Sequence, residues 1–374
     1  MRWLGLIAML AVSGALMAQP PQVWQMQESG TTAGLRGIFS VDGTAAWASG
    51  TDGTVLRTTD GGAHWTKCAI PDEKTDGATL DFRGLQAWDT KTAIVMASGP
   101  GEKSRLYKTK DGCKSWKLIL KNSDKEGFWD ALYFDRGQTG WLLGDPVKEM
   151  FVLFSSNNKG KSWIRQRNKG LHADSKLQGA FAASNSLLFA DGFDVLFGTG
   201  GKSGAMVYSG RQTVICVDEC TPEESGAFGN LHKWNQYGIP LGRNAEASGV
   251  FAIGTRPDSP IAAGFPPRFR VFIAVGGDYT KPNDSNGTAA YSLDGGNHWT
   301  ASTKPPHGYR STVQWSEAEK AWFTAGTNGS DISRDDGKTW QPLDDGNWNA
   351  LSLPFIVGPK GRIAKLNSAA LPKP

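Results

Sequence analysis

One eight-residue pattern recurs five times along the chain. It reads TTDGGAHW at 58–65, TKDGCKSW at 109–116, SNNKGKSW at 156–163, SLDGGNHW at 292–299 and SRDDGKTW at 333–340. Hydroxyl and carboxylate oxygens bond the backbone of tight turns, glycine tolerates positive φ, and a closing Trp can bury the turn against neighbouring strands. The pattern therefore predicts a repeated hairpin turn within a repeat architecture.

The repeated side chains of these turns are predicted to be structural. Asn158 replaces the aspartate in the third copy and Cys113 replaces a glycine in the second. A turn tolerates such exchanges, whereas acid catalysis does not. The residues assigned to the turns are Asp60, Trp65, Asp111, Trp116, Asn158, Trp163, Asp294, Trp299, Asp335 and Trp340.

A second repeated element lies upstream of the turns and occurs seven times, which gives the number of repeats. It reads LRGIF at 35–39, FRGLQ at 82–86, WDALY at 129–133, LQGAF at 177–181, ASGVF at 247–251, YRSTV at 309–313 and WNALS at 348–352. Short apolar runs separated by Gly, Asn, Asp and Pro are typical of strands and turns, and we find no helical periodicity after the leader. The sequence thus predicts an all-β, seven-bladed β-propeller. Its last repeat begins near the C-terminus, so the N-terminal strand is expected to complete the last blade.

Residues 1–18 combine one Arg, an apolar run and small residues, which is typical of a cleaved secretory signal. We expect residues 19–374 to form a single propeller domain that is periplasmic or secreted. No later stretch is long and apolar enough to suggest a membrane span. The net charge of +4 is small and scattered, so nucleic acid is not an expected partner, and a monomer is expected.

Four cysteines in an exported chain permit two disulfides. The candidates are Cys68, Cys113, Cys216 and Cys220. The CVDEC spacing could also suggest a metal site, but no second Cys or His pair lies nearby in sequence. Neither a metal nor a cofactor is therefore expected.

The five turns resemble the Asp-box, also called the bacterial neuraminidase repeat. Together with GIFSVDGTAAWAS at 37–49 and GTDGTVLRTTDGGAHW at 50–65, they make the chain similar to propellers related to the photosystem II stability and assembly factor. The resemblance spans 22–366. It implies a non-catalytic, exported binding or assembly platform for a protein or glycan partner.

The candidate binding surface lies on the face opposite the repeated turns, where the seven first strands begin. The polar positions at these starts are Arg36, Arg83, Asp130, Gln178, Ser248, Arg310 and Asn349. Three arginines in one ring could clamp an anion or a carboxylate. Alternatively, each could pair with a neighbouring acid or carbonyl and line a wet channel.

Two further features are expected on the same face. Asp145 and Asp278 follow Gly at the ends of second strands, and Tyr279 follows Asp278. They are interpreted either as turn caps or as functional acids at the rim. The long inter-blade stretch 221–246 carries Trp234 and Tyr237 and is interpreted as a lid or partner-binding loop.

The alternative function is a sialidase-like or other glycoside hydrolase with its active site at the channel mouth. Its candidate catalytic residues are Asp130, Asp145, Glu246, Asp278 and Tyr279. Two features argue against it. The Arg motif with Pro that is typical of sialidases is absent, and sialidases have six blades.

Overall fold

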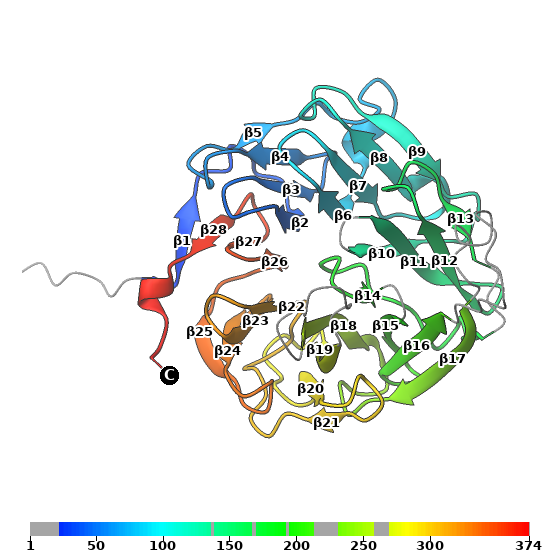
Figure 1. The fold of residues 1–374 in the computed structure, drawn as a ribbon, viewed down its shortest axis with the longest axis vertical. Helices are drawn as coiled ribbons and strands as arrows, with labels where there is room; N and C mark the ends of the chain where they lie inside the picture. Colours follow the sequence, from blue (N-terminus) through cyan, green and yellow to red (C-terminus); the bar gives the residue numbers. More distant parts are fainter. Residues whose placement is uncertain are drawn as a thin grey trace, which may run out of the picture.

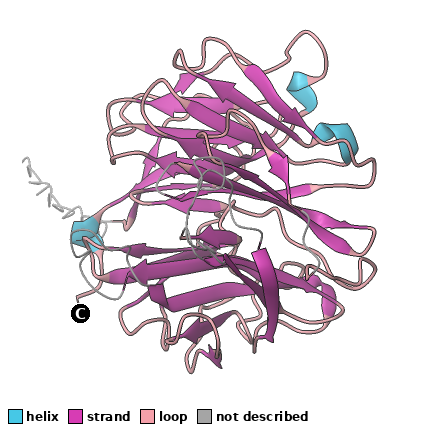
Figure 2. Cartoon of the chain, turned by 45° about the vertical axis from the view of Figure 1, so that its right-hand side comes forward, coloured by secondary structure: helices cyan, strands magenta, loops and turns pink. Residues whose placement is uncertain are grey.

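The computed structural model describes residues 22–135, 138–166, 170–191, 194–212, 231–257 and 269–373. Its strands form a ring of sheets around a central axis (Figure 1). Helical structure in these residues is limited to three single turns, Gly77–Thr79 (η1), Gly101–Lys103 (η2) and Ser368–Ala370 (η3). Figure 2 shows these turns outside the sheets. The predicted all-β fold is confirmed.

Each of the first three blades is a four-stranded antiparallel meander. Blade 1 contains β2 (Leu35–Ser40), β3 (Ala46–Gly50), β4 (Val55–Thr58) and β5 (Thr66–Lys67). Blade 2 contains β6 (Phe82–Ala87), β7 (Ala93–Ala97), β8 (Arg105–Thr109) and β9 (Lys117–Lys121). Blade 3 contains β10 (Trp129–Asp135), β11 (Thr139–Val147), β12 (Met150–Ser156) and β13 (Ile164–Arg165).

Blades 4 and 5 are joined into one larger sheet through β15 and β18. Blade 4 contains β14 (Leu188–Ala190), β15 (Asp194–Gly201), β16 (Met206–Gln212) and β17 (Leu231–Gly238). Blade 5 contains β18 (Ala245–Pro257), β19 (Phe269–Asp278), β20 (Ala289–Ser292) and β21 (Thr300–Ala301). The first strand of blade 4 is short, which becomes important at the channel.

The last two blades close the ring. Blade 6 contains β22 (Thr312–Ser316), β23 (Ala321–Gly326), β24 (Gly329–Ser333) and β25 (Gln341–Asp344). Blade 7 contains β26 (Ala350–Ser352), β27 (Phe355–Val357), β28 (Ile363–Leu366) and, as its outer strand, β1 (Trp24–Gln27). Strand β1 pairs antiparallel with β28, from Trp24 opposite Leu366 to Gln27 opposite Ile363. As predicted, the N-terminal strand completes the last blade.

The innermost strands form an unbroken circle. Strand β2 contacts β6, and the contacts continue through β10, β14, β18, β22 and β26 back to β2. Apolar side chains fill the spaces between adjacent blades, and Trp47, Trp129, Trp141, Trp322 and Trp348 are almost completely buried. Burial of such large side chains stabilises the contacts between blades.

The five repeated turns join the third and fourth strands of blades 1, 2, 3, 5 and 6. In the first turn the Thr58 hydroxyl donates to Asp60 Oδ1 at 2.8 Å and accepts from the Gly62 amide at 3.0 Å. Asp60 Oδ1 also accepts from the His64 amide at 3.0 Å. The same three bonds recur in the other four copies. The acid or amide oxygen is thus engaged in holding the turn.

Two consecutive residues with positive φ shape each turn. In the second copy these are Gly112 and Cys113, with φ of 73° and 64°. Cys113 occupies the glycine position of the pattern and is bonded to Cys68 of blade 1. This disulfide closes a sequence separation of 45 residues and ties two blades together. Cys216 and Cys220 lie outside the described residues.

Asp335 provides a test of the turn's energetics. Its carboxylate accepts from the Ser333 hydroxyl and from both the amide and the hydroxyl of Thr339. We expect Asp335→Ala to lower the free energy of unfolding by about 1 to 2 kcal/mol, because these donors lose their acceptor. Asp335→Asn keeps one oxygen, as Asn158 does naturally, and should cost less than about 0.5 kcal/mol. Urea denaturation measures both; an equal loss in the two variants would contradict this role.

Candidate binding site at the channel mouth

The first strands of blades 1, 2 and 3 begin with a β-bulge, which leaves one residue without a pairing partner. Leu35 and Gly37 oppose the consecutive residues Gly50 and Ser49, so Arg36 is the extra residue. The registers of β6 with β7 and of β10 with β11 leave Arg83 and Asp130 in the same way. A bulge redirects its extra side chain, here into the channel.

The same position recurs in three other blades. In blade 5 the bulged residue is Phe251. In blade 6 the Ser311 amide donates to the carbonyl of Ala325, which is also the strand partner of Thr312. In blade 7 the Asn349 amide donates to the carbonyl of Val357, which is also the strand partner of Ala350. Ser311 and Asn349 therefore occupy the position of the extra residue. All six side chains line one cavity at the start of the inner strands. Arg36, Arg83, Asp130 and Asn349 were predicted from the sequence, whereas Phe251 and Ser311 were missed.

Three predicted members of this ring lie elsewhere. Gln178 is buried against blade 4, where its amide donates to Thr199 Oγ1 and its carbonyl oxygen accepts from the Tyr208 hydroxyl. Ser248 is fully buried and accepts from the Arg243 amide. In blade 5 the residue at the bulge is Phe251, three residues after the predicted Ser248.

Arg310 is the third correction. Its side chain is fully buried, and Nε donates to Asp331 Oδ2 at 2.7 Å. Nη1 donates to the Tyr309 carbonyl at 2.7 Å and to Asn328 Oδ1 at 2.5 Å. In blade 6 the bulge position belongs to Ser311, one residue later than predicted, and Arg310 therefore holds the blade together instead of facing the channel.

The segment 178–187 crosses the channel because it does not form the start of a first strand. In Figure 1 it is the green loop beside β14 near the centre of the ring. Asn185 adopts φ of 66°, accepts from the Leu132 amide at 2.7 Å and donates to the Leu85 carbonyl at 3.3 Å. The Ser184 hydroxyl donates to the Ser311 carbonyl at 2.5 Å. The segment is thereby fastened to blades 2, 3 and 6.

This crossing segment divides the channel into two cavities. Residues 180–183 line the cavity at the mouth, which has a volume of about 450 Å³. Residues 184–186 line a second cavity of about 530 Å³, among residues farther along the inner strands. The mouth cavity consequently has a floor and can hold a ligand, instead of opening into a through-channel.

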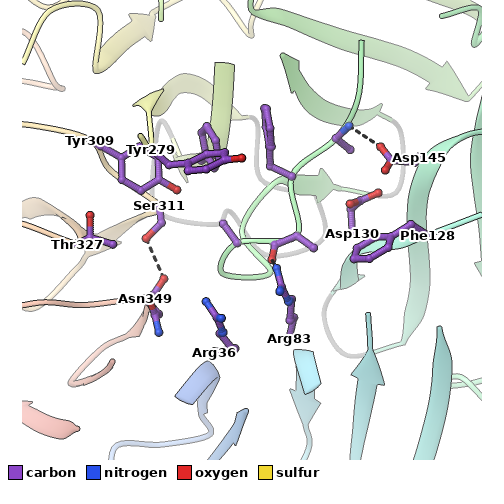
Figure 3. Close-up of a pocket in the computed structure, with 15 residues that line it drawn as sticks. Arg36, Arg83, Phe128, Asp130, Asp145, Tyr279, Tyr309, Ser311, Thr327 and Asn349 are labelled. Carbon is purple, nitrogen blue, oxygen red and sulfur yellow. Dashed lines mark hydrogen bonds between the residues drawn. The ribbon is translucent and has the colours of Figure 1, made fainter. Parts of the chain in front are cut away.

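The mouth cavity has three chemically distinct walls (Figure 3). Arg36 and Arg83 form a basic wall, and Asp130 and Asp145 form an acidic wall beside Phe128. The third wall is aromatic: Phe181 stacks on Phe251 with ring centroids 4.0 Å apart, and Tyr309 and Tyr279 meet Phe251 edge to face at 4.8 and 6.1 Å. An apolar lining with a few convergent polar groups is typical of ligand sites.

The two arginines differ in how firmly they are held. Arg83 Nε donates to Asp81 Oδ2 at 2.8 Å, and Nη1 donates to the Ala182 carbonyl at 2.8 Å. Arg36 Nε lies 4.0 Å from Asp81 Oδ1 and makes no hydrogen bond within the described part of the chain. Burial and the nearby Arg83 charge lower the pKa of Arg36, whereas Asp81 opposes this shift. Arg36 therefore retains donor capacity for a ligand.

A pair of bulges places the two acids side by side. Asp145 is the extra residue between Gly144 and Pro146 in the pairing of β11 with β12, and its amide donates to the Phe128 carbonyl. Burial raises the pKa of Asp145 to about 6, although the Ala180 amide donates to Oδ1 at 2.9 Å and opposes the shift. Burial, then the Asp145 charge, raise the pKa of Asp130 well above its usual value, against the opposing charge of Arg83.

The remaining predicted residues lie outside the cavity, apart from Tyr279. Asp278 caps a turn by accepting from the Thr280 amide and hydroxyl, and Glu246 is exposed beside Lys202 at 3.7 Å. Trp234 and Tyr237 belong to β17, at the outer edge of blade 4. The prediction of a loop over 221–246 is wrong for residues 231–238, which form β17 and pair with β16. Residues 213–230 lie outside the described residues.

Among the residues that the structure describes, no group of three or more His, Cys, Asp or Glu side chains could hold a metal ion. No helix in the same residues has the length and apolar character needed to cross a membrane.

The ring and the three-walled cavity define a seven-bladed propeller with a cavity of about 450 Å³ at its channel mouth. Two solved structures share this fold. YCF48 bound to D1 peptide aligns with a TM-score of 0.57 at 16% identity, covering 94% of this chain and 99% of that one. YCF48 from Cyanidioschyzon merolae aligns with a TM-score of 0.59 at 16% identity, covering 93% and 99%. No protein-family model and no curated protein matches the sequence.

Asn185 tests whether the crossing segment is part of the folded framework. Asn185→Ala removes both of its side-chain bonds and places alanine at positive φ, so we expect the free energy of unfolding to fall by about 2 to 3 kcal/mol. Asn185→Gly keeps the backbone conformation accessible and should lose about 1 kcal/mol less. Urea denaturation distinguishes the two; no change in either variant would mean that the segment is not fastened through Asn185.

The raised pKa of Asp145 predicts how the stability of the fold changes with pH. Because its pKa is higher in the folded protein than in the unfolded chain, ionisation destabilises the fold as the pH rises from about 4 through about 6. Asp145→Asn should therefore be more stable than wild type by about 2 kcal/mol at pH 7.5, and this difference should vanish near pH 4. Denaturation at both pH values checks this, and a pH-independent difference would contradict it.

Proposed function

We propose that this protein is an exported binding and assembly propeller that holds a polypeptide segment of a partner protein in its channel-mouth cavity. The observation that carries the proposal is the cavity closed at its base by residues 180–183, in which the buried Arg36 Nε has no hydrogen-bond acceptor among the described residues and lies near an aromatic wall. An acidic group of the partner supplies that acceptor. Its neighbouring residues pack on Phe181, Phe251 and Tyr279.

The size of the cavity supports a short segment as the ligand. A volume of about 450 Å³ lies within the ordinary range of ligand sites and accommodates a few residues of an extended chain. The solved YCF48 structure with the same fold has a D1 peptide bound. That structure directs the proposal toward a protein partner and away from a glycan.

Export is part of the proposal. The leader-like residues 1–18 carry the features of a secretory signal. The Cys68–Cys113 disulfide supports the same view, because disulfides persist in oxidising compartments such as the periplasm or the extracellular space.

A glycoside hydrolase remains the alternative, and the positions of the acids weigh against it. Glycosidases of the two-carboxylate type place the acids on either side of the scissile bond. Here Asp130 and Asp145 occupy one wall of one blade, while Glu246 and Asp278 lie outside the cavity (Figure 3). The other two walls carry arginines and aromatic rings instead of a second acid.

Peptide selection followed by affinity measurement tests the proposal. The mature protein is used to select from a phage-displayed library of short random peptides, and the enriched peptide is synthesised with a fluorophore. We expect Arg36→Ala to weaken its binding at least about tenfold, because a charge-assisted bond is lost. Arg36→Lys should recover part of the affinity, since it keeps the charge without the planar fork.

Arg243→Ala serves as the matched control, since Arg243 pairs with Asp284 at 3.1 Å and does not line the cavity. It should bind like wild type. Failure to select any peptide, or equal affinity of wild type and Arg36→Ala, would contradict the proposal. Turnover of a fluorogenic glycoside panel that Asp130→Asn abolishes would establish the hydrolase instead.

A further inference from the structure

The acidic wall of the mouth cavity contains a buried polar atom that has no hydrogen-bond partner among the residues that the structure describes. Asp130 is only 2% exposed, and its Oδ2 atom makes no hydrogen bond to any described residue. Its side chain lines the cavity on the side away from Tyr279 and Tyr309 (Figure 3). Buried oxygens of this kind normally have a partner, so an unsatisfied one at a cavity wall is a position where a ligand group can bond.

The charges around the cavity indicate the sign of that group. Strand β2 contributes Arg36, strand β6 contributes Arg83 with Asp81 just before it, and strands β10 and β11 contribute Asp130 and Asp145. The crossing residues 178–183 contain no titratable side chain. Three carboxyl groups thus accompany two guanidinium groups. One additional positive charge would balance the site with all three carboxylates ionised.

The arginines do not supply this balance themselves. Arg83 is turned toward Asp81 and the Ala182 carbonyl, and Arg36 lies nearest to Asp81. Without a cation beside it, burial and then the neighbouring Asp145 charge raise the pKa of Asp130 and so favour its uncharged form. Asp130 and Asp145 therefore lack a fully compensating positive charge when the cavity holds only solvent.

Resting on the proposed function, we propose that Asp130 and Asp145 bind the side-chain ammonium group of a lysine in the partner's peptide, while Arg36 binds an acidic group of the same peptide. An ammonium group carries three donors and can bond both carboxylates at once. The aliphatic lysine stem packs against Phe128 and the other apolar lining. The cavity thus selects a segment that carries both a lysine and an acidic group.

Peptide selection with acidic-wall variants tests which residue the cavity prefers. Peptides selected on wild type should be enriched in lysine at one position, and those selected on Asp130→Asn or Asp145→Asn should lose this enrichment. In the best wild-type peptide, replacing that lysine with norleucine or Nε-acetyl-lysine should weaken binding at least about tenfold. Acetylating the peptide's N-terminus should have no effect, because the side-chain amine and not the terminal amine is the ligand.

The pH dependence of affinity separates this proposal from its rival, in which uncharged Asp130 donates a hydrogen bond to the peptide. Binding of ammonium requires ionised acids, so below about pH 6 it must expel a proton. Affinity of wild type should therefore rise with pH, most steeply below about pH 6, where Asp145 must also lose a proton, and it should continue to rise above pH 6 because the pKa of Asp130 is raised as well. The rival predicts affinity that falls as the pH rises.

Each failure has a distinct signature. Glu246→Gln removes an exposed carboxylate outside the cavity and should leave both lysine enrichment and pH dependence unchanged. Peptide binding that needs Arg36 but shows no lysine preference, or affinity that falls with rising pH, would overturn this inference and leave the proposed function standing. Failure of every selection to yield a peptide would overturn both.

Discussion

The antiparallel pairing of β1 with β28 is the constraint on which the rest of the structure depends. It joins the two ends of the chain and converts a row of similar meanders into a closed ring. Closure brings the seven inner strands around one axis, so that residues from distant parts of the sequence meet at one mouth. The outer strands β5, β13 and β21 have only two residues each, which limits edge-to-edge association, whereas β17 of blade 4 is longer. The five repeated turns, on the other face, join the third strand to the fourth in blades 1, 2, 3, 5 and 6.

The channel is divided into two cavities because blade 4 departs from the repeat. Its first strand is reduced to Leu188–Ala190, and the preceding segment crosses the channel, held by Asn185 and Ser184. This segment separates the mouth cavity from the second cavity, which residues 184–186 line. Bulges in the other blades then direct Arg36, Arg83, Asp130 and Phe251 into the space above it. The cavity is thus assembled from one irregular blade and several regular ones.

The repeated turns made the fold readable from the sequence, since their side-chain chemistry is local and repeats five times. The first-strand positions were only partly predictable. The apolar, polar, small pattern located Arg36, Arg83, Asp130 and Asn349 because the bulge coincides with the polar residue in these blades. It misplaced Arg310 and Ser248, where the bulge lies one and three residues later. Gln178 was misplaced because the crossing segment is fixed by tertiary contacts to Leu85 and Leu132, which leave no periodic trace in the sequence.

The central claim is that a partner's peptide lies on the floor of the mouth cavity, between the basic and acidic walls. A crystal structure of the mature protein with a selected peptide tests it most directly. The account predicts peptide density above residues 180–183, with an acidic group at Arg36 and a lysine ammonium between Asp130 and Asp145. Peptide density at the repeated turns, at the outer edge of a blade or in the second cavity beside residues 184–186, with the mouth cavity empty, would contradict it.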